Sequence, residues 1–187
     1  FTHVLQASWN FNHTLTYGEK MFLKPGCYFE SGVGEMLTLK MLYGTREGLK
    51  EMNSIMLAET VAKTYFDNEN PIGKVLRLDN EVDVKVTGVY EDLPYNTSLR
   101  DMKFILPWSL YLSQNEWVRE MHDPWDSNFT RTFAMVNEQG DIQKISAKIR
   151  DVKLNKVTAE DRRYNPVMFL HPMNKWHLYS DFKNGVN

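Results

Sequence analysis

Gly73 and Lys74 invite comparison with the phosphate-binding loop of nucleotide hydrolases. That loop needs an earlier glycine at a set distance and a serine or threonine after the lysine, because backbone amides and a hydroxyl hold the phosphates and Mg²⁺. Asn68 and Val75 occupy those two positions here. The sequence therefore lacks the motif, and we interpret Gly73-Lys74 as a turn that leads into a strand.

Histidines bind a metal ion when further histidine, cysteine or acidic ligands stand at suitable spacing. His171 and His177 are the closest pair, but Pro172 lies between them and their separation matches no helical ligand spacing. A second group consists of His122, Asp123 and Asp126. A helix stop at Pro124 explains that group, so we expect no metal ion and no cofactor.

Nucleophilic and acid–base catalysis also lack their usual residue patterns. A serine nucleophile would need a sharp turn between a strand and a helix, and no Gly-x-Ser-x-Gly sequence occurs. Glu91 and Asp92 are paired carboxylates, but neighbouring residues of a strand point to opposite faces. We therefore expect no catalytic residue and predict that the chain is not an enzyme.

Three of the five tryptophans fall in one irregular region of the sequence: Trp108, Trp117 and Trp125. Exposed aromatic side chains form platforms for sugars or other ligands, whereas buried ones belong to the core. Core packing is the favoured interpretation, and the three residues remain a candidate interaction surface.

The composition excludes several further classes of protein. Lys and Arg total 22 against 24 Asp and Glu, so long-range attraction to nucleic acid or anionic lipid is not indicated. Cys27 is the only cysteine, which excludes an internal disulfide and a cysteine-based metal cage. A membrane span needs ~20 mostly apolar residues, and no segment qualifies. Since the chain starts at Phe1 without a signal-like segment, we expect flanking sequence in the parent protein.

The first element predicted is a half-buried strand, because apolar residues alternate with polar ones over residues 5–17. A turn at residues 17–20 then predicts an antiparallel hairpin. Pro25-Gly26 is expected to end this unit before another extended piece.

The central third of the chain predicts a strand over residues 54–57 and a helix over residues 59–66. Ala58 is a weak residue for the start of that helix, because Ser, Thr, Asp or Asn would cap its first amides. Residues 75–78 and 82–90 predict a second hairpin. Gly88 indicates a bulge or a close approach of two backbones.

The remaining elements form an α/β succession. We expect a strand over residues 104–106, a helix over 109–121 with Ser109 as its cap, a strand over 129–136, an amphipathic helix over 142–152 with Asp141 as its cap, and a last strand over 167–170.

Three segments carry a resemblance to a known family. They are residues 53–66 (NSIMLAETVAKTYF), residues 69–78 (ENPIGKVLRL) and residues 84–89 (VKVTGV). In this order they closely resemble the MacB-like periplasmic core domain of FtsX-like ABC transporter permeases. The tail HLYSDF, residues 177–182, looks like the segment that precedes the second membrane helix in such permeases.

The resemblance implies an α+β fold of two subdomains. A porter-like α/β subdomain would comprise residues 1–36 and 97–187, and a small mixed α/β subdomain, called sabre in the family, would be inserted at residues 37–96. The first strand and helix of the family pattern are missing, so we expect the domain to be truncated at its N-terminal side.

The resemblance also implies a role. The chain would be the periplasmic domain of an inner-membrane permease that couples cytoplasmic ATP hydrolysis to export, or to movement of lipoproteins or peptides, by mechanotransmission. Its partners would be a cytoplasmic ATPase, a second permease copy and a periplasmic protein, without nucleic acid. A solute- or sugar-binding module that uses the tryptophans is the alternative, and a hydrolase with an unrecognised site is a third hypothesis.

Overall fold

The computed structural model describes residues 1–121, 123, 125, 127–176 and 179–180. It divides into two compact units. We call His3–Glu120 with Phe129–Met135 the sheet unit, and Phe1–Thr2, Met121–Asn128 and Val136–Asn187 the C-terminal unit. In the described residues no helix is both long and apolar enough to span a bilayer.

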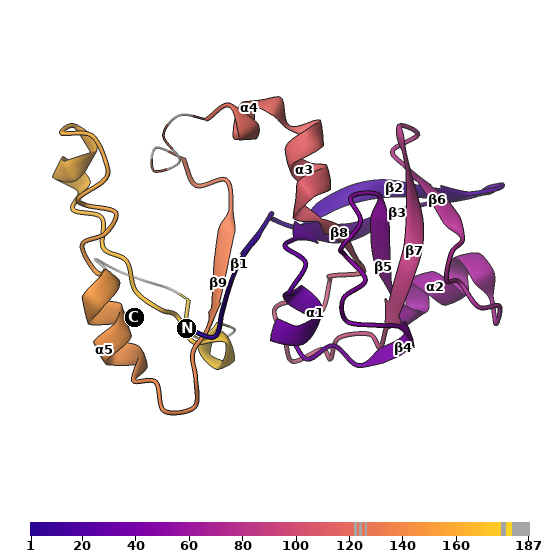
Figure 1. Cartoon of the computed structure of the whole chain (residues 1–187), viewed down its shortest axis with the longest axis horizontal. Helices are drawn as coiled ribbons and strands as arrows, with labels where there is room; N and C mark the ends of the chain where they lie inside the picture. The colour runs from indigo at the N-terminus through magenta and orange to yellow at the C-terminus, as the bar shows by residue number, and fades with distance from the viewer. Residues whose placement is uncertain (122, 124, 126, 177–178, 181–187) are drawn as a thin grey trace. The chain divides into compact units, whose positions relative to one another are not determined.

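The sheet unit is built on one mixed sheet (Figure 1). Its strands are β1 His3–Ala7, β2 Phe11–Tyr17, β3 Lys20–Phe29, β4 Met41–Gly44, β5 Ser54–Ala58, β6 Val75–Leu78, β7 Val82–Tyr90, β8 Phe104–Pro107 and β9 Arg131–Met135. Its helices are α1 Val33–Met36, α2 Glu59–Phe66, α3 Trp108–Gln114 and α4 Glu116–Arg119. This mixed α and β composition confirms the predicted fold class.

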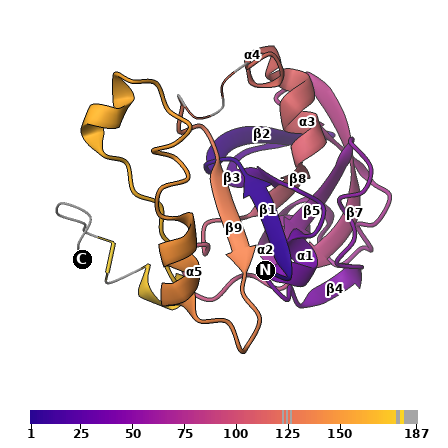
Figure 2. The ribbon, with the colours of Figure 1, turned by 60° about the vertical axis from the view of Figure 1, so that its left-hand side comes forward.

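The strands follow the order β2-β6-β7-β5-β8-β3-β1-β9, with β4 paired to β7. An additional pairing of β2 with β3 closes a hydrogen-bonded ring of six strands, β3-β2-β6-β7-β5-β8. β9 lies along β1 through all five residues of each strand (Figure 2). The sheet is continuous across the limits expected for the inserted part, residues 37–96, and that division stays a prediction.

The predicted single strand over residues 5–17 is wrong, because the chain bends at residues 8–10 and forms β1 and β2. Arg131 holds the bend: its Nε and Nη2 donate to the Ser8 carbonyl at 3.0 and 2.7 Å. The Tyr28 amide donates to Ser8 Oγ at 2.9 Å. The alternation places Trp9 and Phe11 on the buried face of the predicted strand, but both are exposed as a result of the bend.

The expected interruption at Pro25-Gly26 is also wrong, because β3 continues through both residues. The Pro25 carbonyl accepts a hydrogen bond from the Lys103 amide at 3.0 Å, so this imino acid still takes part in the sheet. A side chain at position 26 would overlap the ring of Phe104, so only glycine fits there. Pro25 and Gly26 thus lie within β3 and contact the start of β8, and they form no turn.

The strand, helix and hairpin predicted in the central third are confirmed as β5, α2, β6 and β7. Ala58 provides no side-chain cap for α2, and the Asp92 carboxylate replaces it by accepting from Thr60 N and Oγ1, both at 2.8 Å. At the other end, Lys20 Nζ donates to the carbonyls of Thr64 and Tyr65 at 3.2 and 2.9 Å. The helix is therefore fixed at both ends by residues distant in sequence.

The irregularity expected at Gly88 is confirmed. The register between β5 and β7 shifts there by one residue, so that Thr87 is left between the paired positions. A side chain at position 88 would lie against Met41 and Met56, so β4 and β5 both approach this point of β7 closely.

The helix predicted over residues 109–121 differs from the structure at both ends. α3 begins at Trp108, with Pro107 rather than Ser109 at the cap position. Asn115 Nδ2 donates to the Tyr111 carbonyl at 2.9 Å and separates α3 from the short α4. The stop predicted at residues 122–124 involves His122 and Pro124, which lie outside the described residues.

The C-terminal unit contains α5 Ile142–Ile149 and the 3₁₀ turns η1 Asp161–Tyr164 and η2 Met173–Lys175. Asp141 caps α5 as predicted, accepting from the amides of Gln143 and Lys144 at 2.9 and 3.0 Å. The strand predicted over residues 167–170 is wrong, since this segment pairs with no strand in the described part of the chain. Its amides instead bond to the α5 region, to Arg150 O and Ser146 Oγ.

The two units differ in their interiors. The sheet unit has a large core in which α2 and α3 share one apolar cluster with the strands, and the cluster includes Leu15, Ile55, Leu57, Tyr65, Leu76, Val86, Phe104 and Trp108. In the C-terminal unit, Val157 is the only buried residue among those described. The sheet unit therefore has the larger packed interior, and we expect it to be the more stable of the two.

Candidate interaction site

β4 is the most accessible strand of the sheet unit. Among the described strands it pairs with β7 alone, so no described strand pairs with its other edge. Leu42 and Tyr43 are 40% and 42% exposed. Because successive side chains of a strand point to opposite faces, both faces of β4 are open to solvent.

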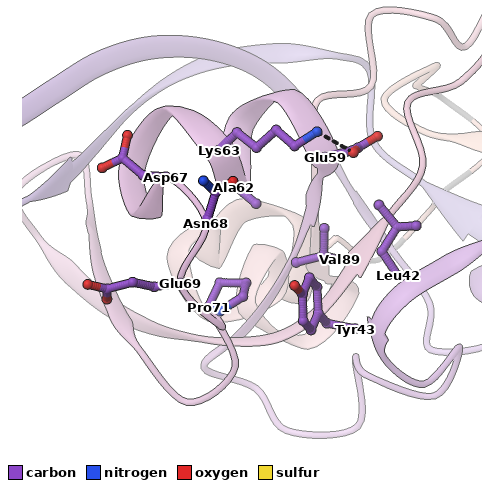
Figure 3. A pocket seen from close by; sticks show the side chains of 10 residues that line it. All are labelled: Leu42, Tyr43, Glu59, Ala62, Lys63, Asp67, Asn68, Glu69, Pro71 and Val89. Carbon is purple, nitrogen blue, oxygen red and sulfur yellow. Dashed lines mark hydrogen bonds and ion pairs between the residues drawn. The ribbon is translucent and has the colours of Figure 1, made fainter.

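A groove of about 430 Å³ lies between β4 and α2 (Figure 3). Its apolar wall consists of Leu42, Tyr43, Ala62, Pro71 and Val89, and its polar rim of Glu59, Lys63, Asp67, Asn68 and Glu69. The loop after α2 begins at Asp67, whose φ is +54°, and is bonded to β7 through the Gly73 amide, which donates to Val86 O. Of the apolar wall only Leu42 and Tyr43 are exposed, while Ala62, Pro71 and Val89 form its buried floor. Exposed apolar side chains beside a charged rim are typical of a protein contact surface.

The charged groups of the rim are paired. Lys63 Nζ lies 2.6 Å from Glu59 Oε1 along one turn of α2, and this hydrogen bond raises the pKa of the Lys63 ammonium. Asp67 pairs with Lys20 at 3.4 Å, and Glu69 pairs with Lys74. Each of these charges therefore lies beside one of opposite sign, and the rim is close to electrically neutral.

Asp92 positions α2 beside this groove. Burial alone would raise the pKa of its carboxyl, but hydrogen bonds from Lys103 Nζ at 2.8 Å and from Thr60 outweigh burial and lower it. The carboxylate therefore stays charged and joins the end of β7, the start of α2 and Lys103. In the sequence Asp92 stands out only as half of a carboxylate pair with Glu91, because nothing there shows which helix it reaches.

The three tryptophans of the predicted interaction surface have different surroundings. Trp108 is 8% exposed and stacks on Tyr111 at 4.8 Å in the core. Trp117, on α4, is 51% exposed, and Phe129 meets its ring edge to face at 5.4 Å. Trp125 belongs to the C-terminal unit, where its amide donates to Asp123 Oδ1. Of the two candidate tryptophans in the sheet unit, Trp117 thus has the more accessible ring.

The glycine–lysine pair of the sequence lies in a turn, away from any phosphate-binding geometry of the kind considered above. Gly73 has a φ of +83° and donates its amide to Val86 O at 2.8 Å, so it forms the predicted turn into β6. Among the described residues no three histidine, cysteine, aspartate or glutamate side chains gather as metal ligands do. His122, Asp126 and His177 lie outside the described residues.

The strand β4 was not predicted from the sequence. Residues 41–44 are too short for a periodic pattern, and only the apolar run before Gly44 could have indicated a strand. Gly44 has a φ of +71°, and a side chain there would overlap the Thr87 carbonyl. The pairing of β4 with the bulged part of β7 therefore depends on glycines of two different segments.

The family model of the MacB-like periplasmic core domain matches residues 4–152 of this chain. None of the curated proteins matches the sequence.

Solved structures show the same fold. A domain assigned to a permease of Porphyromonas gingivalis is similar with a TM-score of 0.66 and 15% identity, covering 84% of this chain and 71% of that one. The periplasmic region of MacB from Actinobacillus actinomycetemcomitans is similar with a TM-score of 0.63 and 15% identity, covering 96% and 77%. The extracellular domain of the noncanonic ABC-type transporter YknZ from Gram-positive bacteria is similar with a TM-score of 0.60 and 12% identity, covering 89% and 80%.

Proposed function

We propose, on the premise that this chain belongs to the MacB-like periplasmic core domain family, that it transmits motion driven by cytoplasmic ATP hydrolysis to the outer side of the membrane. Family membership makes it the periplasmic, extracytoplasmic domain of an ABC transporter permease. The resemblance seen in the sequence is thereby confirmed. The proposed outcome of the motion is export, or movement of a lipoprotein or peptide.

The closed ring of six strands is the observation that best supports this role. A body that transmits motion must resist deformation, and packed interiors have low compressibility. Each strand of the ring is hydrogen-bonded on both sides, and α2 is fixed at both ends by Asp92 and Lys20. In this proposal the domain supplies shape and stiffness and performs no catalysis of its own.

The proposed partners are a cytoplasmic ATPase, reached through the membrane part of the parent protein, a second permease copy and a periplasmic protein. The groove beside β4 is the surface we assign to a protein contact, because it combines an open strand edge with an apolar wall. Trp117 is a second exposed contact residue within the sheet unit.

The experiment measures distances in the intact permease together with its ATPase. A spin label on Val75→Cys reports the distance between two copies, and a second protein with labels on Val4→Cys and Val75→Cys reports a distance within one sheet unit. Both side chains are exposed, whereas the native Cys27 is buried and is not expected to take the label.

Trapping the ATPase with nucleotide and vanadate should shift the distance between copies and leave the distance within one unit unchanged. If the distance between copies is the same with and without trapped nucleotide, mechanotransmission is refuted. A change within the unit would show that the domain deforms instead of moving as one body.

A further inference from the structure

The apolar side of α5 is only partly covered. Its apolar residues recur at intervals of three and four and form one stripe, which continues just past the end of the helix: Ile142, Ile145, Ile149 and Val152. None of the four is buried, and the first and the last are each 37% exposed. Such a stripe normally faces a core. In the described part of the C-terminal unit, however, Val157 is the only buried residue, so α5 has little core to face.

The extended segment that lies next to α5 adds further exposed apolar side chains. Residues 167–170 run beside the helix, because two of their amides donate to the Arg150 carbonyl and to Ser146 Oγ, at 2.9 and 3.0 Å (Figure 2). Successive side chains of an extended segment point to opposite sides. Val167 and Phe169 therefore share one side, and each is 43% exposed. The helix and this segment together leave apolar surface in contact with water.

The same part of the chain is basic. Residues 142–156 carry one carboxylate, on Asp151, against five cationic side chains, on Lys144, Lys148, Arg150, Lys153 and Lys156. The formal charge of the whole chain is −2, so this local excess does not appear in the overall composition. Lys144 and Lys148 are four residues apart on α5, so they form a row beside the apolar stripe. The side chain of Lys144 is 82% exposed, and its ion pair with Asp141 is long, at 3.6 Å.

An anionic lipid surface matches both features. An amphipathic helix lies in the plane of a membrane with its apolar side between the headgroups and the acyl chains, while its lysines extend to the lipid phosphates. Negative lipids attract each nearby lysine in addition. Since the chain belongs to a membrane permease as its extracytoplasmic domain, a lipid surface is always near it. The stripe and the charge together therefore indicate a membrane as the occupant of this surface.

We propose that α5 and residues 167–170 form a docking surface for an anionic lipid membrane. The apolar stripe enters the headgroup region, and Lys144 and Lys148 contact lipid phosphates beside it. The proposal rests on membership of the permease family and not on mechanotransmission. The experiments below use the isolated chain without an ATPase, so the two proposals can fail separately.

The first test is sedimentation of the 187-residue chain with lipid vesicles. Vesicles that contain phosphatidylglycerol should bind the chain roughly tenfold or more tightly than vesicles of neutral phosphatidylcholine. High salt should weaken the binding to anionic vesicles, because it screens the attraction between lysines and phosphates. Absence of binding to anionic vesicles, or equal binding to both kinds, would overturn the proposal and leave the surface to a protein partner.

Charge variants test whether the lysines of α5 make the contact. Lys144→Gln combined with Lys148→Gln should weaken binding to anionic vesicles by about thirtyfold. Lys50→Gln combined with Lys85→Gln is the matched control, since it removes the same charge from exposed positions of the sheet unit. The control should change the affinity by about twofold or less. Equal losses in the two double variants would show attraction to the net charge alone and contradict a docking surface on α5.

A fluorescent label tests whether the apolar stripe enters the membrane. The environment-sensitive dye NBD, attached to Ile142→Cys, should shift its emission to shorter wavelength when anionic vesicles are added, whereas the same dye on Val75→Cys should not. Both positions are exposed, and the native Cys27 is buried. If Ile142→Cys does not fold, Val152→Cys tests the other end of the stripe. An unshifted emission from the stripe, or an equal shift at position 75, would overturn the proposal.

Discussion

At the scale of single residues, Cys27 shows how burial controls reactivity. Its side chain is fully buried, and loss of solvation raises the pKa of the thiol to about 12, although the charge of Arg131 acts in the opposite direction. The thiolate is the reactive form. Cys27 should therefore react with Ellman's reagent at pH 8 roughly a hundredfold or more slowly in the folded chain than in urea. Similar rates in both states would show that the thiol is accessible.

Arg131 is a second residue whose contribution, here to stability, can be measured. It donates twice to the Ser8 carbonyl, and its guanidinium lies over the rings of Trp9 and Phe133 at 5.5 and 5.6 Å. Arg131→Ala should lower the free energy of unfolding by about 2 to 3 kcal/mol, because it leaves the carbonyl unpaired and removes both ring contacts.

Urea denaturation measures this loss of stability, and two further variants serve as a conservative replacement and a control. Arg131→Lys should recover only part of the stability, since one ammonium cannot reproduce the forked geometry. Arg119→Ala, which removes an exposed pair with Glu116, should change stability by about 0.5 kcal/mol or less. Equal effects at positions 131 and 119 would contradict the role of Arg131 in the bend between β1 and β2.

At the scale of elements, Asp92 tests how α2 is held in place. Asp92→Asn should lower the free energy of unfolding by about 1 to 2 kcal/mol, because an amide accepts less strongly from Thr60 and loses the ion pair with Lys103. Circular dichroism during urea unfolding measures the change. Asp83→Asn is a suitable control, since Asp83 has an exposed arginine partner in Arg77 and no helix to cap.

The same residue predicts a dependence on pH. The pKa of the Asp92 carboxyl is lower in the folded state than its ordinary value of 3.8. Its stabilising contribution is therefore complete above the ordinary value and is lost as the pH falls through the folded value. The difference in stability between wild type and Asp92→Asn should stay constant near neutral pH and shrink only below about pH 4. A difference that shrinks between pH 8 and 6 would point to another group.

Local signals explain which elements could be predicted. The alternation in residues 82–86, the helical spacing in residues 59–66 and the cap at Asp141 all act within one element, and the structure confirms them. The bend at Ser8 could not be predicted, because Arg131 lies more than a hundred residues further along the chain. The same holds for the candidate site, where β4 exists only through its pairing with β7.

At the scale of the whole molecule, the two units should differ in stability. The sheet unit has a large apolar core, whereas Val157 is the only buried residue among those described in the C-terminal unit. Amides of α5 should therefore exchange with deuterium on the order of a thousandfold faster than those of β5 and β7. Hydrogen-exchange mass spectrometry of the full chain measures both, and equal protection would show that the units unfold together.

The ring of six strands has a mechanical consequence. In an open sheet a load on an outer strand can peel that strand away, one ladder at a time. In a ring the same load divides between two routes, through β2 and β6 on one side and through β8 and β5 on the other. A pull on β3 must therefore rupture the ladders with β2 and β8 at once, in addition to its short pairing with β1, so the ring acts as a clamp.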